Sequence, residues 1–61
     1  MIIIEVKLPN GQVVHRSRHR TKTGRVADAV DLGKRRGWTG AKVLLDGVEK
    51  ATVPAAPKRI A

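Results

Sequence analysis

Cationic side chains recur at every second position between residues 16 and 22 of this chain. They are Arg16, Arg18, Arg20 and Lys22. In an extended segment, successive side chains point to opposite faces, so these four would project from the same side of a strand. A row of like charges repels itself and adds nothing to a core. This spacing suits the binding of closely spaced anions, and a polyphosphate backbone is their commonest cellular source.

Two further groups of residues extend the basic run. Residues 21–25 end the predicted strand and begin a predicted helix, so hydroxyls, cations and free backbone N–H groups converge at a positive dipole end. This arrangement suits a phosphate, although an ordinary helix cap has the same composition. Residues 34–36 add a cluster at the other end of the helix. The candidate nucleic-acid-binding residues are Arg16, Arg18, Arg20, Lys22, Thr23, Gly24, Arg25, Lys34, Arg35 and Arg36.

A pair of histidines, His15 and His19, has the spacing that places two metal ligands together on a helix. They lie in the segment that the alternation predicts to be extended, where such a spacing covers about 13 Å. The chain has no cysteine, and no acidic residue neighbours the histidines in sequence. We interpret them as polar residues of the basic segment and predict no metal site.

A pair of carboxylates, Asp28 and Asp31, could serve acid-base chemistry or a metal ion. Arg25 and Arg35 stand at helical ion-pairing distance from them, so ordinary ion pairs explain the two acids better. The sequence also contains no nucleophile elbow and no phosphate-binding glycine loop followed by Lys and Ser or Thr. We predict a protein that is not an enzyme and uses no cofactor.

The elements that position these residues begin with a hairpin. Residues 2–8 alternate as a half-buried strand, and Pro9-Asn10-Gly11 suits a three-residue loop in which Gly takes positive φ. This loop pairs Leu8 with Gln12, Val6 with Val14, Glu5 with His15 and Ile4 with Arg16. A register slipped by one residue would instead place Glu5 opposite Arg16, and this alternative remains open.

A helix is predicted over residues 23–36, because Val26, Ala29, Val30 and Gly33 follow the spacing of one apolar stripe. Thr23 is the expected N-cap, and Gly37 the expected left-handed residue after the helix. Trp38 would then fold back toward Leu32. Gly33 costs about 1 kcal/mol relative to Ala inside a helix, so its place on the buried stripe predicts close approach of the sheet.

A second hairpin is predicted over residues 41–53, around the turn dipeptide Asp46-Gly47. Pairing Leu45 with Val48 directs Leu44 to the outer face, where it could form a dimer contact. Residues 54–61 contain two prolines and two cations, and we expect a flexible basic tail.

These elements predict a small single α+β domain, ββαββ, in which an antiparallel sheet of two hairpins packs on one helix. Residues 1–53 would form the compact domain and residues 54–61 the tail. A core this small gives a monomer little stability, so a homodimer remains an alternative. The apolar run at residues 1–4 is too short for a signal or membrane segment, so we expect a cytoplasmic protein.

Thirteen Lys and Arg against five Asp and Glu give a net charge of +8. The chain has no Phe or Tyr and a single Trp, which argues against a surface that stacks unpaired bases. The leading hypothesis is therefore a small nucleic-acid-binding protein that contacts the phosphates of duplex DNA or structured RNA, with duplex DNA favoured. The alternative is an inhibitor or adaptor that binds an acidic protein. Membrane binding is disfavoured, because the basic segment has no interleaved large apolar residues.

Overall fold

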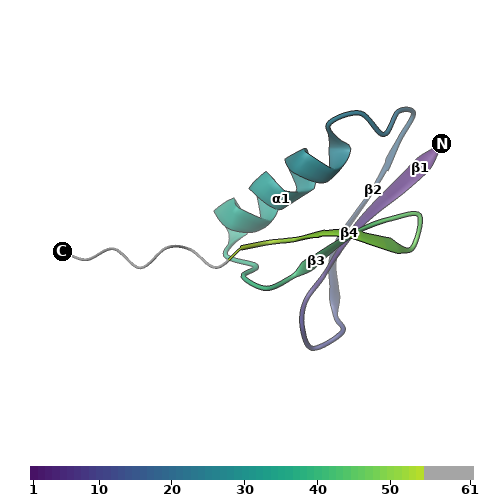
Figure 1. The fold of residues 1–61 in the computed structure, drawn as a ribbon. Coiled ribbons are helices and arrows are strands. Elements are labelled where there is room, and N and C mark those ends of the chain that lie inside the picture. The colour runs from purple at the N-terminus through teal and green to yellow at the C-terminus, as the bar shows by residue number, and fades with distance from the viewer. Residues whose placement is uncertain (55–61) are drawn as a thin grey trace.

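Two β-hairpins flank a single helix along the chain (Figure 1). The elements are β1 (Ile2–Lys7), β2 (Val13–His19), α1 (Arg25–Arg36), β3 (Lys42–Leu45) and β4 (Val48–Thr52). The hairpins join through β1 and β3 into one antiparallel sheet of order β2-β1-β3-β4. This confirms the predicted α+β class and the ββαββ order. The computed structural model describes residues 1–54, so the predicted tail with Lys58 and Arg59 lies outside the described residues.

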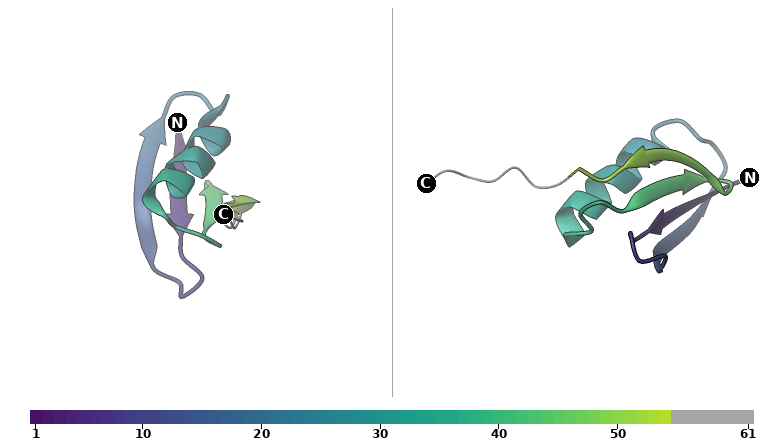
Figure 2. Two further views of the ribbon diagram at one scale, coloured as in Figure 1. Left: turned by 90° about the vertical axis from the view of Figure 1, so that its left-hand side faces the viewer. Right: turned by 60° about the horizontal axis from the view of Figure 1, so that its bottom comes forward.

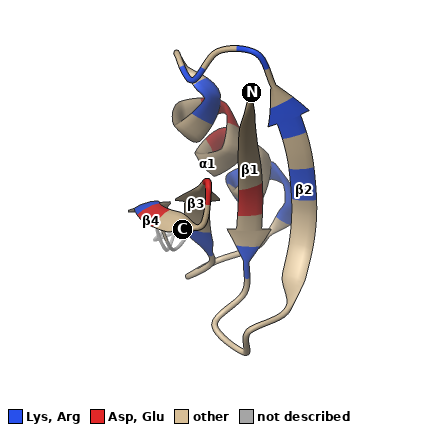
Figure 3. Cartoon of the chain, turned by 90° about the vertical axis from the view of Figure 1, so that its right-hand side faces the viewer, with Lys and Arg blue, Asp and Glu red and all other residues tan. Residues whose placement is uncertain are grey.

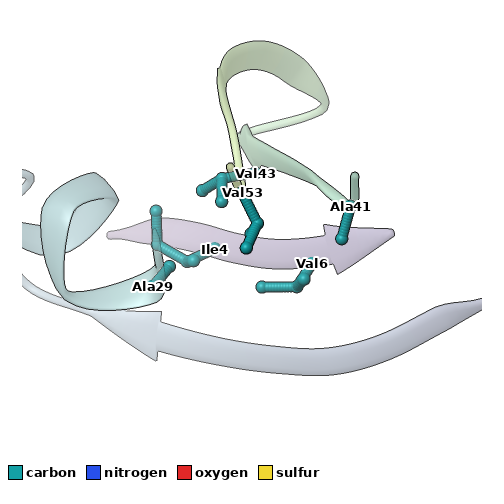
Figure 4. Close-up of a cluster of buried hydrophobic side chains, with 6 residues drawn as sticks. All are labelled: Ile4, Val6, Ala29, Ala41, Val43 and Val53. Atoms are coloured by element: carbon teal, nitrogen blue, oxygen red, sulfur yellow. The ribbon is translucent and has the colours of Figure 1, made fainter. Parts of the chain in front are cut away.

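The helix crosses one face of the sheet and packs against β1, β3 and β4 (Figure 2). The most apolar strands, β1 and β3, occupy the centre, and the two edges are formed by the more polar β2 and β4. The core beneath the helix is built from small side chains (Figure 4). Its members are Ile4, Val6, Ala29, Ala41, Val43 and Val53. The inner face of β2 lies to one side of this core, and the helix leaves it largely uncovered.

Close approach of the helix and sheet occurs at Gly33, as the apolar stripe predicts. A Cβ atom at this position would lie 2.5 Å from Cγ2 of Val53, a residue that is 1% exposed. Val53 extends the sheet beyond β4, since its N–H donates to the carbonyl of Ala41 at 2.7 Å. The absence of a side chain at Gly33 therefore sets how closely α1 packs on the sheet.

The helix ends at the predicted residue and begins at a different one. At its end, Gly37 is left-handed with φ 75°, and the N–H of Trp38 donates to the carbonyl of Gly33 at 2.8 Å, as in a Schellman motif. At its start, the prediction of Thr23 as N-cap is wrong. The N-cap is Gly24, which is left-handed with φ 72° and makes no side-chain cap bond. The chain enters the helix through a glycine turn that only a residue lacking Cβ adopts at low cost.

The first hairpin has the predicted loop and the alternative register. The N–H of Leu8 donates to the carbonyl of Gln12 at 2.8 Å, which closes the three-residue loop. A β-bulge at Val14 then shifts the pairing by one residue. The observed partners are Ile4 with Ser17, Glu5 with Arg16, Val6 with His15 and Lys7 with Val13. The predicted Val6–Val14, Glu5–His15 and Ile4–Arg16 pairs are therefore wrong.

The second hairpin turns at Asp46-Gly47 with φ of 52° and 81°, and Leu45 pairs with Val48 as predicted. Asp46 also ties this turn to β1, because its Oδ1 accepts the N–H of Ile3 at 2.9 Å. Leu44 lies on the outer face opposite Glu49 and is half-buried.

Candidate nucleic-acid interface

The basic strand β2 forms one edge of the sheet and turns two of its cations away from the helix. Ile4 and Val6 face the core, so their β2 partners Ser17 and His15 share the inner face, and Arg16 and Arg18 take the outer one. Both arginines are exposed, and they stand about 6.7 Å apart along the strand. Figure 3 shows this basic stretch continuing from β2 over the connection toward the start of α1.

A weak ion pair holds one of these arginines over the neighbouring strand. Nε of Arg16 lies 3.9 Å from Oε2 of Glu5, and the Arg16 side chain is 61% exposed. A solvent-exposed contact of this length contributes at most about 1 kcal/mol. Arg18 forms no ion pair within the described residues. Both guanidinium groups are therefore available to an external anion.

The remaining cations of the alternating run lie beyond the strand. The alternation predicts an extended segment through residue 22, but β2 ends at His19, so Arg20 and Lys22 belong to the connection that leads into α1. Arg20, Lys22, Thr23 and Gly24 are all exposed. The N–H of Arg25 donates to the carbonyl of Lys22 at 3.2 Å, which folds this connection into a turn at the helix start. The run is thus a short strand face continued by a basic turn.

The cluster at the helix end is separate from this run. Lys34, Arg35 and Arg36 occupy the last turn of a 12-residue helix, which places them about 14–17 Å along its axis from the first residue. All three are exposed. Of these residues, Arg35 also faces the side of the helix near β2, where it lines a groove. The structure therefore divides the ten candidate residues between two regions of the surface.

This groove, of about 290 Å³, runs between α1 and the inner face of β2. Its floor is apolar and is formed by Ile4, Ala29 and Leu32. Its polar lining comes from both walls and consists of His15, Ser17, His19, Arg25, Asp28 and Arg35. Within it, Ser17 Oγ and His19 Nε2 share a hydrogen bond of 2.7 Å.

The arginines of the groove lack the carboxylate partners that helical spacing predicts. The ion pairs of residues 1–54 join Arg16 to Glu5 and Lys42 to Glu49, and neither Asp28 nor Asp31 has a basic group within 4.0 Å. The predicted Arg25–Asp28 and Asp31–Arg35 pairs are therefore wrong. The Nε atom of Arg25 is buried and has no hydrogen-bond partner in the described part of the chain.

The sequence alone indicates only that the histidines are polar members of the basic run. The structure places His15 and His19 on the groove side of β2, and the His15 ring lies 6.3 Å from that of Trp38. The signal for this was the alternation itself, since residues 15, 17 and 19 must face away from residues 16 and 18. Among residues 1–54, no three His, Cys, Asp or Glu residues gather closely enough to hold a metal ion.

The helix of residues 1–54 is neither long nor apolar enough to cross a membrane. Comparison of the chain with protein-family models, with curated proteins and with solved structures gave no match. The chemistry of the surface described above is therefore the basis for the proposed function.

Proposed function

We propose that this protein binds duplex nucleic acid, with DNA favoured, without catalysing a reaction. It does so mainly through phosphate contacts from the basic run formed by Arg16, Arg18, Arg20 and Lys22. The observation that carries the proposal is the outward placement of Arg16 and Arg18 on an edge strand, continued by a basic turn at the helix start. Such a protein would act in the cytoplasm, at the nucleoid.

The edge position of β2 supports a basic strand face that lies against the backbone of a duplex. Arg16 and Arg18 repeat every second residue at about 6.7 Å on the outer face of this strand, whereas β1 is a central strand that also pairs with β3. Duplex DNA carries one charge per about 1.7 Å of axis, so several phosphates lie within reach of a basic run of this length. Backbone N–H groups of the first helical turn, other than those of Arg25 and Asp28, which already donate to carbonyl groups, add donors at the helix start, where phosphates are favoured.

Other binding modes have weaker support. Trp38 is the only Trp, Tyr or Phe of the chain, and it is half-buried against the core, so it offers no stacking platform. The exposed side of α1 carries Asp28 and Asp31, which would repel phosphates if the helix entered a groove. This favours the hairpin over the helix as the contact surface.

An acidic protein partner remains the rival interpretation. Protein interfaces usually have an apolar centre inside a polar rim. On residues 1–54 the exposed large apolar side chains are Met1, Val13 and Val48, and Met1 and Val13 stand at opposite ends of the first hairpin. The outer face of β2 instead offers closely spaced guanidinium groups, which suits a repeating polyanion better.

The test is the salt dependence of duplex binding with a matched pair of double variants. For about five phosphate contacts, log affinity should fall with log salt at a slope of roughly −4.5. Arg16→Gln/Arg18→Gln should weaken binding about tenfold or more, for any sequence, and reduce the slope by about 2.

The control is Lys42→Gln/Lys50→Gln, which removes the same charge from β3 and β4. The control also resembles the test variant in a second respect, because each double variant breaks one exposed ion pair. Equal weakening by the two double variants, or a slope near zero for the native protein, would refute the proposal. Retention of one acidic protein after nuclease treatment would then support the rival.

A further inference from the structure

The groove between α1 and β2 gathers hydrogen-bond donors that the fold itself does not use. Arg25 and Arg35 line it from the helix, and neither has a carboxylate within 4.0 Å. The buried Nε of Arg25 has no partner among the described residues, although leaving a buried N–H unpaired is destabilising. From the opposite wall, His15 and the hydrogen-bonded pair of Ser17 and His19 add further polar groups.

We propose that this groove binds a phosphate monoester. Guanidinium groups form paired hydrogen bonds with the oxygens of phosphates and carboxylates, and such charge-assisted bonds are the strong ones. One guanidinium group, with two parallel N–H donors, is sufficient to bind a carboxylate. A phosphate monoester has three acceptor oxygens and a charge between about −1.5 and −2, which suits a cationic donor on one wall and polar groups on the other. Arg35 holds the anion with His15 and Ser17 opposite it, because Trp38, just after the helix end, lies beside His15. Arg25 stands about 15 Å further back along the helix and adds positive charge at the other end of the groove.

The floor of the groove sets the size of the rest of the ligand. Ile4, Ala29 and Leu32 offer an apolar surface, and the volume of about 290 Å³ lies at the lower end of ordinary ligand pockets. The groove thus suits the phosphate and part of the organic group of a small phosphomonoester. The same chemistry occurs at the 5′-phosphorylated end of a nucleic acid strand.

This site is distinct from the surface proposed for duplex binding. Residues 15, 17 and 19 face the groove, whereas Arg16 and Arg18 face outward from the same strand. The two proposals can therefore fail separately. Duplex affinity is tested with Arg16→Gln/Arg18→Gln, and occupancy of the groove is tested with Arg35→Gln.

The experiment titrates the native chain with adenosine 5′-monophosphate, using adenosine as the unphosphorylated control. Trp38 provides the readout, because its ring lies 6.3 Å from that of His15 and it is the only Trp in a chain without Tyr or Phe. Amide chemical shifts of Ser17 and Arg25 give a second readout. We expect saturable changes with the monophosphate and none with adenosine. The absence of a saturable change would overturn the proposal.

Charge variants then locate the site. Arg35→Gln should weaken monophosphate binding about tenfold or more, whereas Lys50→Gln, an equal charge change on β4, should leave it within about twofold. Asp28→Asn removes the only acid of the groove and should strengthen binding about threefold, whereas Asp31→Asn, on the same helix outside the groove, should not. Equal effects within either pair would mean that net charge alone governs binding, and would overturn the assignment.

A final comparison distinguishes the two possible sources of the phosphate group, a free monophosphate and the 5′ end of a nucleic acid strand. A duplex with 5′-phosphorylated ends is compared with the same duplex bearing 5′-hydroxyl ends, using the shifts of Ser17 as the readout. Perturbation by the phosphorylated duplex and by the monophosphate supports a site open to both sources. Perturbation by the monophosphate alone supports a free metabolite as the ligand.

Discussion

Gly33→Ala should destabilise this protein, although Ala is the better helix former. An ideal Cβ at Gly33 lies 2.5 Å from Cγ2 of Val53, 3.2 Å from its Cγ1 and 3.4 Å from its Cβ. Val53 is branched at Cβ and 1% exposed, so it has little freedom to turn away. The added methyl group must therefore displace either the helix or the strand end.

The magnitude follows from two opposing effects. Replacing Gly by Ala inside a helix gains about 1 kcal/mol, and overpacking a close-packed site costs about 1–3 kcal/mol. Because the contact involves two methyl groups and Cβ of a buried residue, we place the cost near the upper end. The net loss is then about 1–2 kcal/mol, which corresponds to a fall in Tm of about 4–16 °C for a domain of this size.

Thermal unfolding followed by circular dichroism measures this change, and Ala27→Gly, on the exposed face of the same helix, calibrates the propensity effect. Val53→Ala removes the opposing methyl groups. The double variant Gly33→Ala/Val53→Ala should therefore be more stable than the sum of the single variants predicts, by about 1–2 kcal/mol. A rise in Tm for Gly33→Ala, or strict additivity in the double variant, would refute the close-approach argument.

Three further predictions concern the turns and the interface. Gly37→Ala should cost about 1–2 kcal/mol of stability, measured by urea unfolding, because φ is 75° and open space around the residue leaves backbone strain as the cause. Asp46→Ala should cost a similar amount in the same assay and Asp46→Asn less, since Asp46 has φ 52° and its Oδ1 accepts a backbone N–H at 2.9 Å. Glu5→Gln should strengthen duplex binding about threefold in fluorescence anisotropy by removing a carboxylate 3.9 Å from Arg16. Glu49→Gln at the far edge should not, and equal gains would contradict a local effect.

Much of the fold was predictable because local signals agreed with one another. The Asp46-Gly47 turn fixes the second hairpin, since its positive φ values are those that a two-residue hairpin requires. Gly37 ended the helix as predicted, because a left-handed residue there satisfies the last carbonyl groups. Gly33 indicated close packing, because a glycine on a buried stripe has no other benefit to offset its cost. The alternation of cations also placed Arg16 and Arg18 on one face, whatever the register.

The errors arose where two local solutions were both acceptable. Thr23 and Gly24 can each begin a helix, and the sequence signal favours the hydroxyl, whereas the turn closed by the N–H of Arg25 uses the glycine. The groove was not predicted at all. It forms because the helix packs on β1, β3 and β4 and leaves one side of β2 uncovered, and no local pattern specifies where a helix lies across a sheet.

The register of the first hairpin connects the fold to the proposed functions. The loop alone favours a flush pairing that places Arg16 opposite the buried Ile4, on the inner face beside the core. Partial burial of a guanidinium group there without a partner is unfavourable, whereas a bulge leaves a single residue unpaired. The chain adopts the bulge at Val14, which turns the cations outward and the groove residues of β2 inward. Neither the loop sequence nor the alternation predicts this register by itself. The register follows from the competition between loop geometry and the cost of partly burying a charge. The bulge thereby gives β2 two chemically different faces, one suited to a repeating polyanion and the other to a single phosphate group.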